Sequence, residues 1–195
     1  MQWILAIALG YALGSVPFGL IVTRIAGAGD LRSIGSGNIG ATNVLRTGRR
    51  GLAATTLLLD LLKGLAAVLI AANWLPGTEV AAALAAFIGH CFPVWLRFRG
   101  GKGVATTAGI CFGFAWPVGL TYAVTWLGLL AVTRISSLAG MTAALVAPIA
   151  AFLFGHREAA AGLLVIALLV LFQHRENIAR LRAGTEPRIG GSKSG

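Results

Sequence analysis

The sequence predicts an all-α integral membrane protein, built as one polytopic bundle of about seven transmembrane helices. Three observations lead to this prediction. Hydrophobic residues make up 57% of the 195 residues and charged residues only 11%, with a mean hydropathy of +0.83. Apolar runs of about 17–25 residues recur along the chain, and such runs are long enough to cross the hydrocarbon core of a bilayer. The basic residues fall almost entirely between these runs.

No linker long enough to separate domains interrupts these runs, so we expect a single membrane-embedded domain over 1–195. The fourth and fifth runs are short and meet at 116–119, so five or six full spans with a re-entrant pair fit them as well. Small residues at helical spacing, as at Gly10 and Gly14 or at Gly109 and Gly113, predict close helix contacts. In chain order, the expected spans are 2–23, 52–74, 79–96, 104–118, 119–133, 138–155 and 159–173, followed by a tail over 174–195.

The net charge of +10 follows from topology. Only cytoplasmic loops need to be basic in a membrane protein. With seven spans and the N-terminus outside, all but two of the sixteen Lys and Arg residues face the cytoplasm or its membrane surface. The exceptions are Lys63, inside a span, and Arg157, on the outside. We therefore expect the C-terminus and all the polar motifs on the cytoplasmic side, and no nucleic acid as partner.

The loop after the first span has the composition of an anion site. It is too long for a tight turn, so we expect it to fold against the bundle. Glycines bring backbone N–H groups close to an anion, uncharged side chains add hydrogen bonds, and an arginine adds a permanent charge. These groups are Gly35, Gly37 and Gly40, then Ser36, Asn38, Thr42 and Asn43, and finally Arg46.

Two charged residues lie inside the second span, where they are expensive unless they pair or meet water. Asp60 and Lys63 are three residues apart on one helix. We expect a structural ion pair beneath the polar loops.

A second glycine cluster follows the third span. Gly100, Gly101 and Gly103 flank Lys102, and the next helix points its positive N-terminal end at the same place. An anion is the natural ligand. A nucleotide is not, because Leu96 and Gly103 stand where a Walker A loop needs Gly and Ser or Thr. The Gly-x-Gly-x-x-Gly pattern at 35–40 also lacks the preceding β-strand of a dinucleotide site.

A third cluster begins the tail. His174 and Asn177 are three residues apart, so they share a helix face and can both point at the anion site. The arginines beside them, Arg175, Arg180 and Arg182, are expected to touch lipid headgroups. Two serines at 136–137 leave two readings open, because they could extend the anion site or cap the sixth span.

Taken together, these motifs closely resemble the bacterial acyl-phosphate:glycerol-3-phosphate acyltransferases, the PlsY family of integral membrane enzymes. The resemblance covers nearly the whole chain. It is carried by 14–19, 30–43, the Asp60 and Lys63 pair, 89–106 and 174–186.

The resemblance implies transfer of a fatty acyl group from acyl phosphate to the 1-hydroxyl of glycerol 3-phosphate, giving lysophosphatidic acid and phosphate. This is the first acylation of phospholipid synthesis. The implied localisation is the bacterial inner membrane, with no cofactor, no metal and a monomeric enzyme. The functional residues that it implies are Ser36, Arg46, the glycine loop with Lys102, His174 and Asn177, while Glu186 is structural.

Acyl phosphate is already an activated anhydride, so positioning and charge stabilisation matter more than a strong nucleophile. We expect direct attack by the glycerol hydroxyl in a ternary complex. The competing route is an acyl-serine on Ser36 with His174 as base. Outside this class, a transporter of phosphorylated anions would also be apolar and basic, but it usually has repeat symmetry and midplane polar sites. A non-catalytic scaffold leaves the three anion clusters unexplained.

Overall fold

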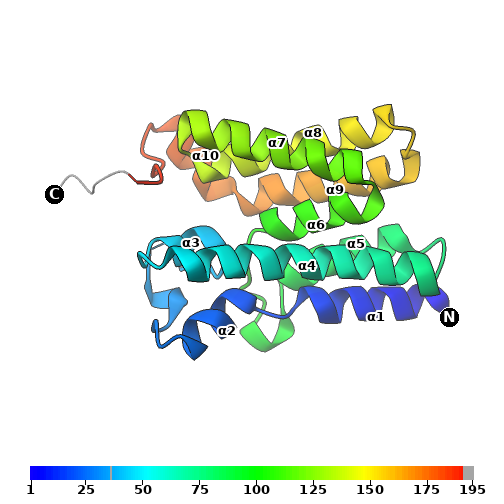
Figure 1. Cartoon of the computed structure of the whole chain (residues 1–195), viewed down its shortest axis with the longest axis horizontal. Helices are drawn as coiled ribbons and strands as arrows, with labels where there is room; N and C mark the ends of the chain where they lie inside the picture. Colours follow the sequence, from blue (N-terminus) through cyan, green and yellow to red (C-terminus); the bar gives the residue numbers. More distant parts are fainter. Residues whose placement is uncertain (36, 191–195) are drawn as a thin grey trace.

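The computed structural model describes residues 1–35 and 37–190 of the chain. Over these residues all regular secondary structure is helical, and the long helices run side by side in one bundle (Figure 1). The α-helices are α1 (Gln2–Gly14), α2 (Phe18–Ile25), α3 (Ala41–Leu45), α4 (Arg50–Trp74), α5 (Glu79–Cys91), α6 (Val104–Phe114), α7 (Trp116–Thr133), α8 (Ser136–Leu153), α9 (Arg157–Gln173) and α10 (Arg175–Arg182); the 3-10 turns are η1 (Leu31–Ser33) and η2 (Val94–Leu96).

The expected spans are present as helices, but not all of them are long enough to cross a bilayer. Within the described residues, five helical segments are long and apolar enough to span a membrane, and the first of them, Gln2–Ile25, combines α1 and α2. A sixth results if α9 and α10, which meet at a bend of 60°, form one broken span. The remaining segment, α6, has 11 residues. At 1.5 Å per residue it covers about 16 Å, roughly half of the hydrocarbon core.

The predicted boundary between the fourth and fifth spans is wrong. The fourth span was expected to run to 118, but α6 ends at Phe114 and α7 begins at Trp116. Ala115, with φ −163° and ψ 136°, is extended and separates the two helices. Pro117 lies in the first turn of α7, where a missing N–H leaves no hydrogen bond unmade, and it would break a helix continued through 118.

Pro17 breaks the first expected span in the same way, because it cannot donate the helical hydrogen bond that a continuous helix needs at this position. The chain leaves α1 at Gly14 and resumes as α2 at Phe18. The break lies within the bundle and not at its end (Figure 1).

The predicted close contacts of small residues are confirmed. A Cβ atom on Gly10 or Gly14 would overlap the backbone of α5 at Ala82 or Ala86. A Cβ on Gly109 would likewise overlap the α4 backbone at Leu61. Backbones that approach this closely gain packing contacts, which drive helix association in lipid.

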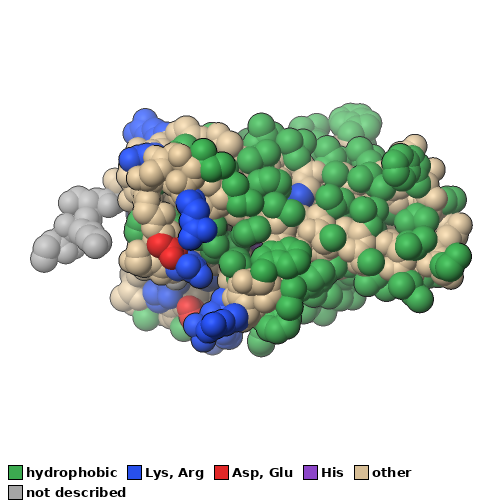
Figure 2. Space-filling model, turned by 90° about the horizontal axis from the view of Figure 1, so that it is seen from below, with side chains coloured by type: hydrophobic (Ala, Val, Ile, Leu, Met, Phe, Trp, Pro, Cys, Tyr) green, Lys and Arg blue, Asp and Glu red, His purple; other side chains and the backbone are tan. Residues whose placement is uncertain are grey.

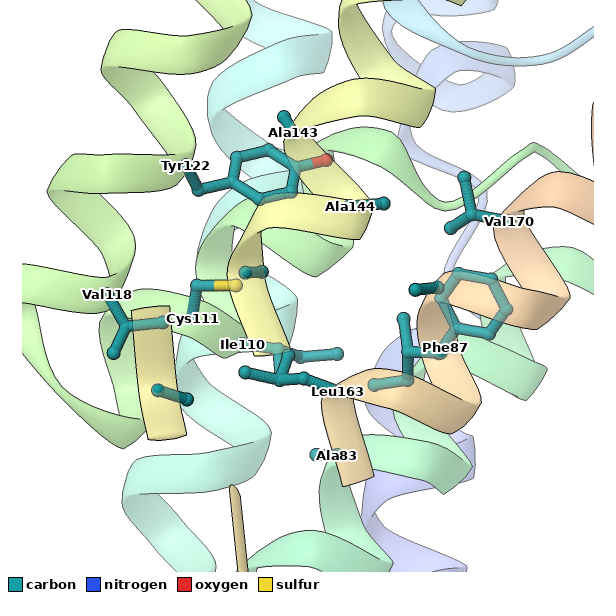
Figure 3. Packing of buried hydrophobic residues seen from close by; sticks show 14 of the residues in the cluster. Ala83, Phe87, Ile110, Cys111, Val118, Tyr122, Ala143, Ala144, Leu163 and Val170 are labelled. Atoms are coloured by element: carbon teal, nitrogen blue, oxygen red, sulfur yellow. The ribbon is translucent and has the colours of Figure 1, made fainter. Parts of the chain in front are cut away.

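Larger side chains fill the space between α5, α6, α7, α8 and α9 (Figure 3). Phe87, Ile110, Tyr122 and Leu163 are almost completely buried there. The Tyr122 hydroxyl donates to the Val104 carbonyl at 2.9 Å and so ties α7 to the first residue of α6. Exposed leucine, isoleucine, valine and aromatic side chains cover much of the outside, while Lys and Arg gather at the end opposite the N-terminus (Figures 1 and 2).

Candidate active site

A cavity of about 740 Å³ opens in the charged end of the bundle. All three polar motifs contribute to its wall, so the structure brings together residues that are far apart in the sequence. The predicted site residues that line it are Gly35, Asn38, Gly40, Thr42, Asn43, Arg46, Asp60, Lys102, Gly103, His174, Asn177 and Glu186. Ser36 lies outside the described residues, and Gly37, Gly100, Gly101 and Lys63 are not among those that line the cavity.

Asn43 organises the first loop. Its side-chain NH2 donates to the carbonyls of Leu31, Ile34 and Asn38 at 2.8–3.0 Å, and the residue is 2% exposed. These three bonds hold the loop in a tight curve around one amide. Arg46 lies against the inner side of this curve, because its Nη1 would be 3.2 Å from a Cβ on Gly35.

Four of the loop glycines do not present free N–H groups as the sequence suggested. The N–H of Gly37 donates to Ile34 O at 3.0 Å, and that of Gly40 donates to Asn38 Oδ1 at 2.9 Å. Gly100 and Gly101 donate to the carbonyls of Cys91 and His90 at 3.0 Å each. These four N–H groups satisfy the protein's own carbonyls, so the prediction that they cradle an anion is corrected. The charged side chains of the cavity are left as its main anion-binding groups.

The second loop crosses directly over the last turn of α5. A Cβ on Gly101 would overlap the His90 imidazole, and a Cβ on Gly103 would overlap the Phe87 ring. Gly103 also has φ +80°, a left-handed conformation that favours glycine. Glycine is therefore needed here for close approach, and this approach brings Lys102 to the cavity wall.

Lys102 is held by a hydrogen-bond network that connects its loop with α8, α10 and the segment after α10. Its Nζ donates to Asn177 Oδ1 in α10, and Asn177 Nδ2 donates to Glu186 Oε1 at 2.5 Å. Ser137 in α8 donates to the same Glu186 oxygen at 2.6 Å, and Arg180 Nε donates to the other at 2.7 Å. Asn177 thus links Glu186 to Lys102 through two consecutive hydrogen bonds.

Burial and these contacts change the acidity of the cavity groups. Burial lowers the pKa of Lys102, an effect that nearby Glu176 opposes. Burial raises the pKa of Glu186, but the hydrogen bonds from Ser137, Asn177 and Arg180 outweigh it, and the net pKa lies below the ordinary value. Glu186 is therefore ionised at neutral pH and suited to hold donors.

His174 stands at the joint between α9 and α10 and is 3% exposed. Burial lowers its pKa to about 4, against a raising effect from the hydrogen bond between its Nδ1 and the Val170 carbonyl at 2.8 Å. A carbonyl only accepts, so we assign the ring proton to Nδ1. The neutral ring then has Nε2 as a hydrogen-bond acceptor.

The predicted ion pair between Asp60 and Lys63 is confirmed. Lys63 Nζ lies 2.7 Å from Asp60 Oδ1, and both side chains are nearly completely buried. The same Nζ donates to the Val16 carbonyl at 2.8 Å, at the break between α1 and α2. Asp60 and His90 both line the cavity.

An apolar recess of about 200 Å³ adjoins the cavity between α3, α4 and α7. Leu57, Trp126 and Ile189 line both spaces, so the two are contiguous. Leu45, Ala53 and Leu130 continue the apolar wall. A molecule with an anionic head and an alkyl tail fits this combination.

Several cavity residues escaped the sequence interpretation. Arg180 was expected at lipid headgroups, but it pairs with Glu186. Of the two readings left open for Ser136 and Ser137, the structure agrees with the first, because both residues line the cavity. Neither caps α8 by its side chain, since Ser136 bonds Thr42 at 2.9 Å and Ser137 bonds Glu186. Arg188 belongs to the segment 187–190, which lines the cavity and is fixed where Ile189 N donates to Arg134 O at 2.8 Å. Arg180 meets Glu186 only because the chain turns back after Arg182, the last residue of α10, so their separation in the sequence did not predict the pair.

The fold and this cavity define a class: a polytopic helical membrane protein whose cation-lined site opens at one end of the bundle and continues into an apolar recess. Known proteins narrow the class. The family model described as glycerol-3-phosphate acyltransferase matches residues 4–184. A glycerol-3-phosphate acyltransferase of Novosphingobium aromaticivorans is 67% identical over 193 residues, covering 99% of this chain and 98% of the relative. One of Erythrobacter litoralis is 58% identical over 186 residues, covering 95% and 94%.

Solved structures agree with this. The glycerol 3-phosphate form of PlsY, an integral membrane glycerol 3-phosphate acyltransferase, superposes with a TM-score of 0.91 and 37% identity, over 97% of this chain and 96% of that one. The lysophosphatidic acid form of PlsY gives a TM-score of 0.90 and 36% identity over the same shares. The chain belongs to the glycerol-3-phosphate acyltransferase family and is an integral membrane acyltransferase of phospholipid synthesis.

Proposed function

We propose that this protein transfers a fatty acyl group from acyl phosphate to the 1-hydroxyl of glycerol 3-phosphate, producing lysophosphatidic acid and inorganic phosphate. The observation that carries the proposal is the junction of a cation-lined cavity with an apolar recess. Both substrates bear phosphates, which need cations, and the donor also bears an alkyl chain, which needs the recess. A site for glycerol 3-phosphate alone has no use for apolar walls.

The polar side chains in this proposal have separate roles. Arg46 and Lys102 hold the two phosphates, with Ser36 as a further phosphate contact. Asn177 positions Lys102, and Glu186 fixes Asn177. His174, neutral and with Nε2 as acceptor, orients a substrate hydroxyl. No metal or cofactor takes part.

The reaction proceeds by direct transfer. The oxygen of the glycerol 1-hydroxyl forms a bond with the acyl carbonyl carbon, and the bond from that carbon to the phosphate oxygen breaks. The hydroxyl proton goes to a substrate phosphate oxygen, and inorganic phosphate leaves. Arg46 and Lys102 stabilise the charge that collects on the leaving phosphate, an electrostatic effect that is strong in a partly desolvated cavity.

The proposed orientation places the N-terminus outside and the cavity on the cytoplasmic side of the bacterial inner membrane. The gathering of Lys and Arg at one end supports it, because cytoplasmic ends of membrane proteins are basic (Figure 2). This orientation gives water-soluble glycerol 3-phosphate access from the cytoplasm. The acyl donor reaches the recess from the bilayer, and the enzyme works as a monomer.

The test uses purified protein in detergent with radiolabelled glycerol 3-phosphate and, in parallel, acyl phosphate, acyl-coenzyme A or no donor. Lysophosphatidic acid should form with acyl phosphate in the presence of a chelator and without added nucleotide. Product from acyl-coenzyme A but not from acyl phosphate would overturn the assignment of the donor. Direct transfer also requires that acyl phosphate alone releases no burst of phosphate and that double-reciprocal plots intersect.

A further inference from the structure

A buried charged layer lies directly beneath the loop that carries Lys102. It consists of Asp60 and Lys63 in α4 and His90 in α5, whose exposed fractions are 3%, 4% and 4%. Ionic groups inside a membrane bundle are expensive, and they are retained mainly where they serve a site. The mechanism above does not use any of the three.

The His90 imidazole stands between the ion pair and the loop. On one side, its Nδ1 lies 3.7 Å from Asp60 Oδ1, close enough for charge to orient the ring but too far for a hydrogen bond. On the other side, a Cβ on Gly101 would overlap the ring at Nε2. A change in the ring is therefore felt by the loop backbone one residue before Lys102.

The backbone around the ring fastens the loop to the same place. The N–H of Gly101 donates to the His90 carbonyl at 3.0 Å, and Gln173 Nε2 donates to the Gly101 carbonyl at 3.2 Å. Gly101 is thus held from below by α5 and from the side by α9. Lys102 follows immediately and reaches across to Asn177.

We propose that His90 is a positioning residue for Lys102, and that the Asp60 and Lys63 pair holds the His90 ring in the orientation on which the loop rests. His90 acts through the lysine and does not touch the reacting atoms. The inference rests on the proposed function, in which Lys102 binds a phosphate.

A double-mutant cycle tests this. His90→Ala leaves a void under Gly101, and a displacement of the order of 1 Å in a positioned group lowers turnover by up to about a hundredfold. If His90 acts only through Lys102, then His90→Ala adds little to the loss already caused by Lys102→Ala. A residue that only supports the fold would lower turnover by the same factor in both backgrounds.

Leu163→Ala is the matched structural control, because Leu163 is as buried as His90 but lies in α9 ten residues before Gln173, the α9 residue that bonds the loop. Its effect should be additive with Lys102→Ala. His90→Gln keeps a planar amide that can reach the position of Nε2 under Gly101, so it should recover part of the activity. Additive losses for His90→Ala, or no recovery by His90→Gln in correctly folded protein, would overturn the proposal.

A readout without the reaction separates this inference from the proposed function. In protein with Cys91→Ala and Cys111→Ala, Lys102→Cys reports the loop position by its rate of modification with a small thiol reagent. His90→Ala should change this rate, and Leu163→Ala should not. If His90→Ala changes the modification rate but the wild-type protein forms no product from acyl phosphate, the positioning role stands and the proposed donor fails. An unchanged modification rate refutes the positioning role.

Discussion

Replacing Glu186 by alanine is expected to lower turnover by about 30- to 160-fold while the protein stays folded. Its carboxylate accepts hydrogen bonds from Ser137 at 2.6 Å, Asn177 at 2.5 Å and Arg180 at 2.7 Å. The Glu186 side chain is 6% exposed, and that of Arg180 is 37% exposed. Water can therefore replace the bond to Arg180, and we leave that bond out of the magnitude.

The bonds from Ser137 and Asn177 remain. An intramolecular hydrogen bond contributes about 1–1.5 kcal/mol net of the bonds to water that it replaces, so the two together hold the arrangement by about 2–3 kcal/mol. Because Asn177 accepts a hydrogen bond from Lys102, loss of this arrangement displaces the cation that binds phosphate in the proposed mechanism. At 1.36 kcal/mol per factor of ten, the expected decrease is the range given above.

The assay measures radiolabelled lysophosphatidic acid formed by purified variants, with size-exclusion chromatography and circular dichroism as checks of folding. Glu186→Gln keeps an acceptor for Ser137 but turns an amide toward Arg180, so its activity should lie between wild type and Glu186→Ala. Glu158→Ala removes an exposed carboxylate at the start of α9 and serves as control. Activity of folded Glu186→Ala within threefold of wild type would refute the reasoning.

Three further predictions concern charge, pH and topology. Lys102→Ala and Arg46→Ala should each lower kcat/KM about a hundredfold, the equivalent of about 3 kcal/mol, and Arg46→Lys should recover little if the contact is bidentate; near-normal kinetics of both alanine variants would remove them from the site. Burial holds the pKa of His174 at about 4, so the ring stays neutral above that pH. The pH profile of wild-type kcat/KM should therefore show no inflection near pH 6.5 that disappears in His174→Ala. The stability of the folded protein should instead fall as the pH is lowered from 6.5 to 4, because His174 takes up its proton at a higher pH in the unfolded chain than in the folded protein. If the difference in melting temperature between wild type and His174→Ala stayed constant over that interval, the pKa of His174 would not be depressed. Single cysteines at Arg99 and Glu158 in a cysteine-free background should react with impermeant reagents from opposite sides of the membrane; labelling from one side contradicts the seven-segment topology.

The helices and the meeting of three polar motifs were predictable, since both depend on local signals. Hydropathy marks apolar runs regardless of tertiary context, and the spacing of Asp60 and Lys63 places them on one helix face. The same three-residue spacing predicted that His174 and Asn177 lie on one side of the chain after α9, and both line the cavity. A charged side chain exposed to lipid is costly in free energy, so the charged groups of an apolar chain gather where they can pair or meet water.

The helix breaks and the use of the glycine N–H groups were not predictable. Hydropathy is as high in 104–118 as in a full span, although Ala115 divides it. Whether an N–H is free depends on which carbonyl lies opposite it in the folded protein, and for Gly100 and Gly101 those carbonyls belong to the end of α5. Arg180 likewise has a partner only because the chain turns back after α10.

These departures from regular spans are what create the site. Irregular backbone at membrane depth is tolerated only where it is buried in protein or lines a hydrated cavity. Besides the break at Ala115, the described part of the chain leaves regular helix at Pro17, over 92–103 and at His174, and the side chains that meet around the cavity lie at or near these three places. Lys63 Nζ bonds the carbonyl at the first break, the Lys102 loop forms the second, and His174 occupies the third. An uninterrupted bundle of the same composition would bury its apolar surface equally well, but it would offer no polar groups at the depth where a lipid-dissolved donor and a water-dissolved acceptor can meet.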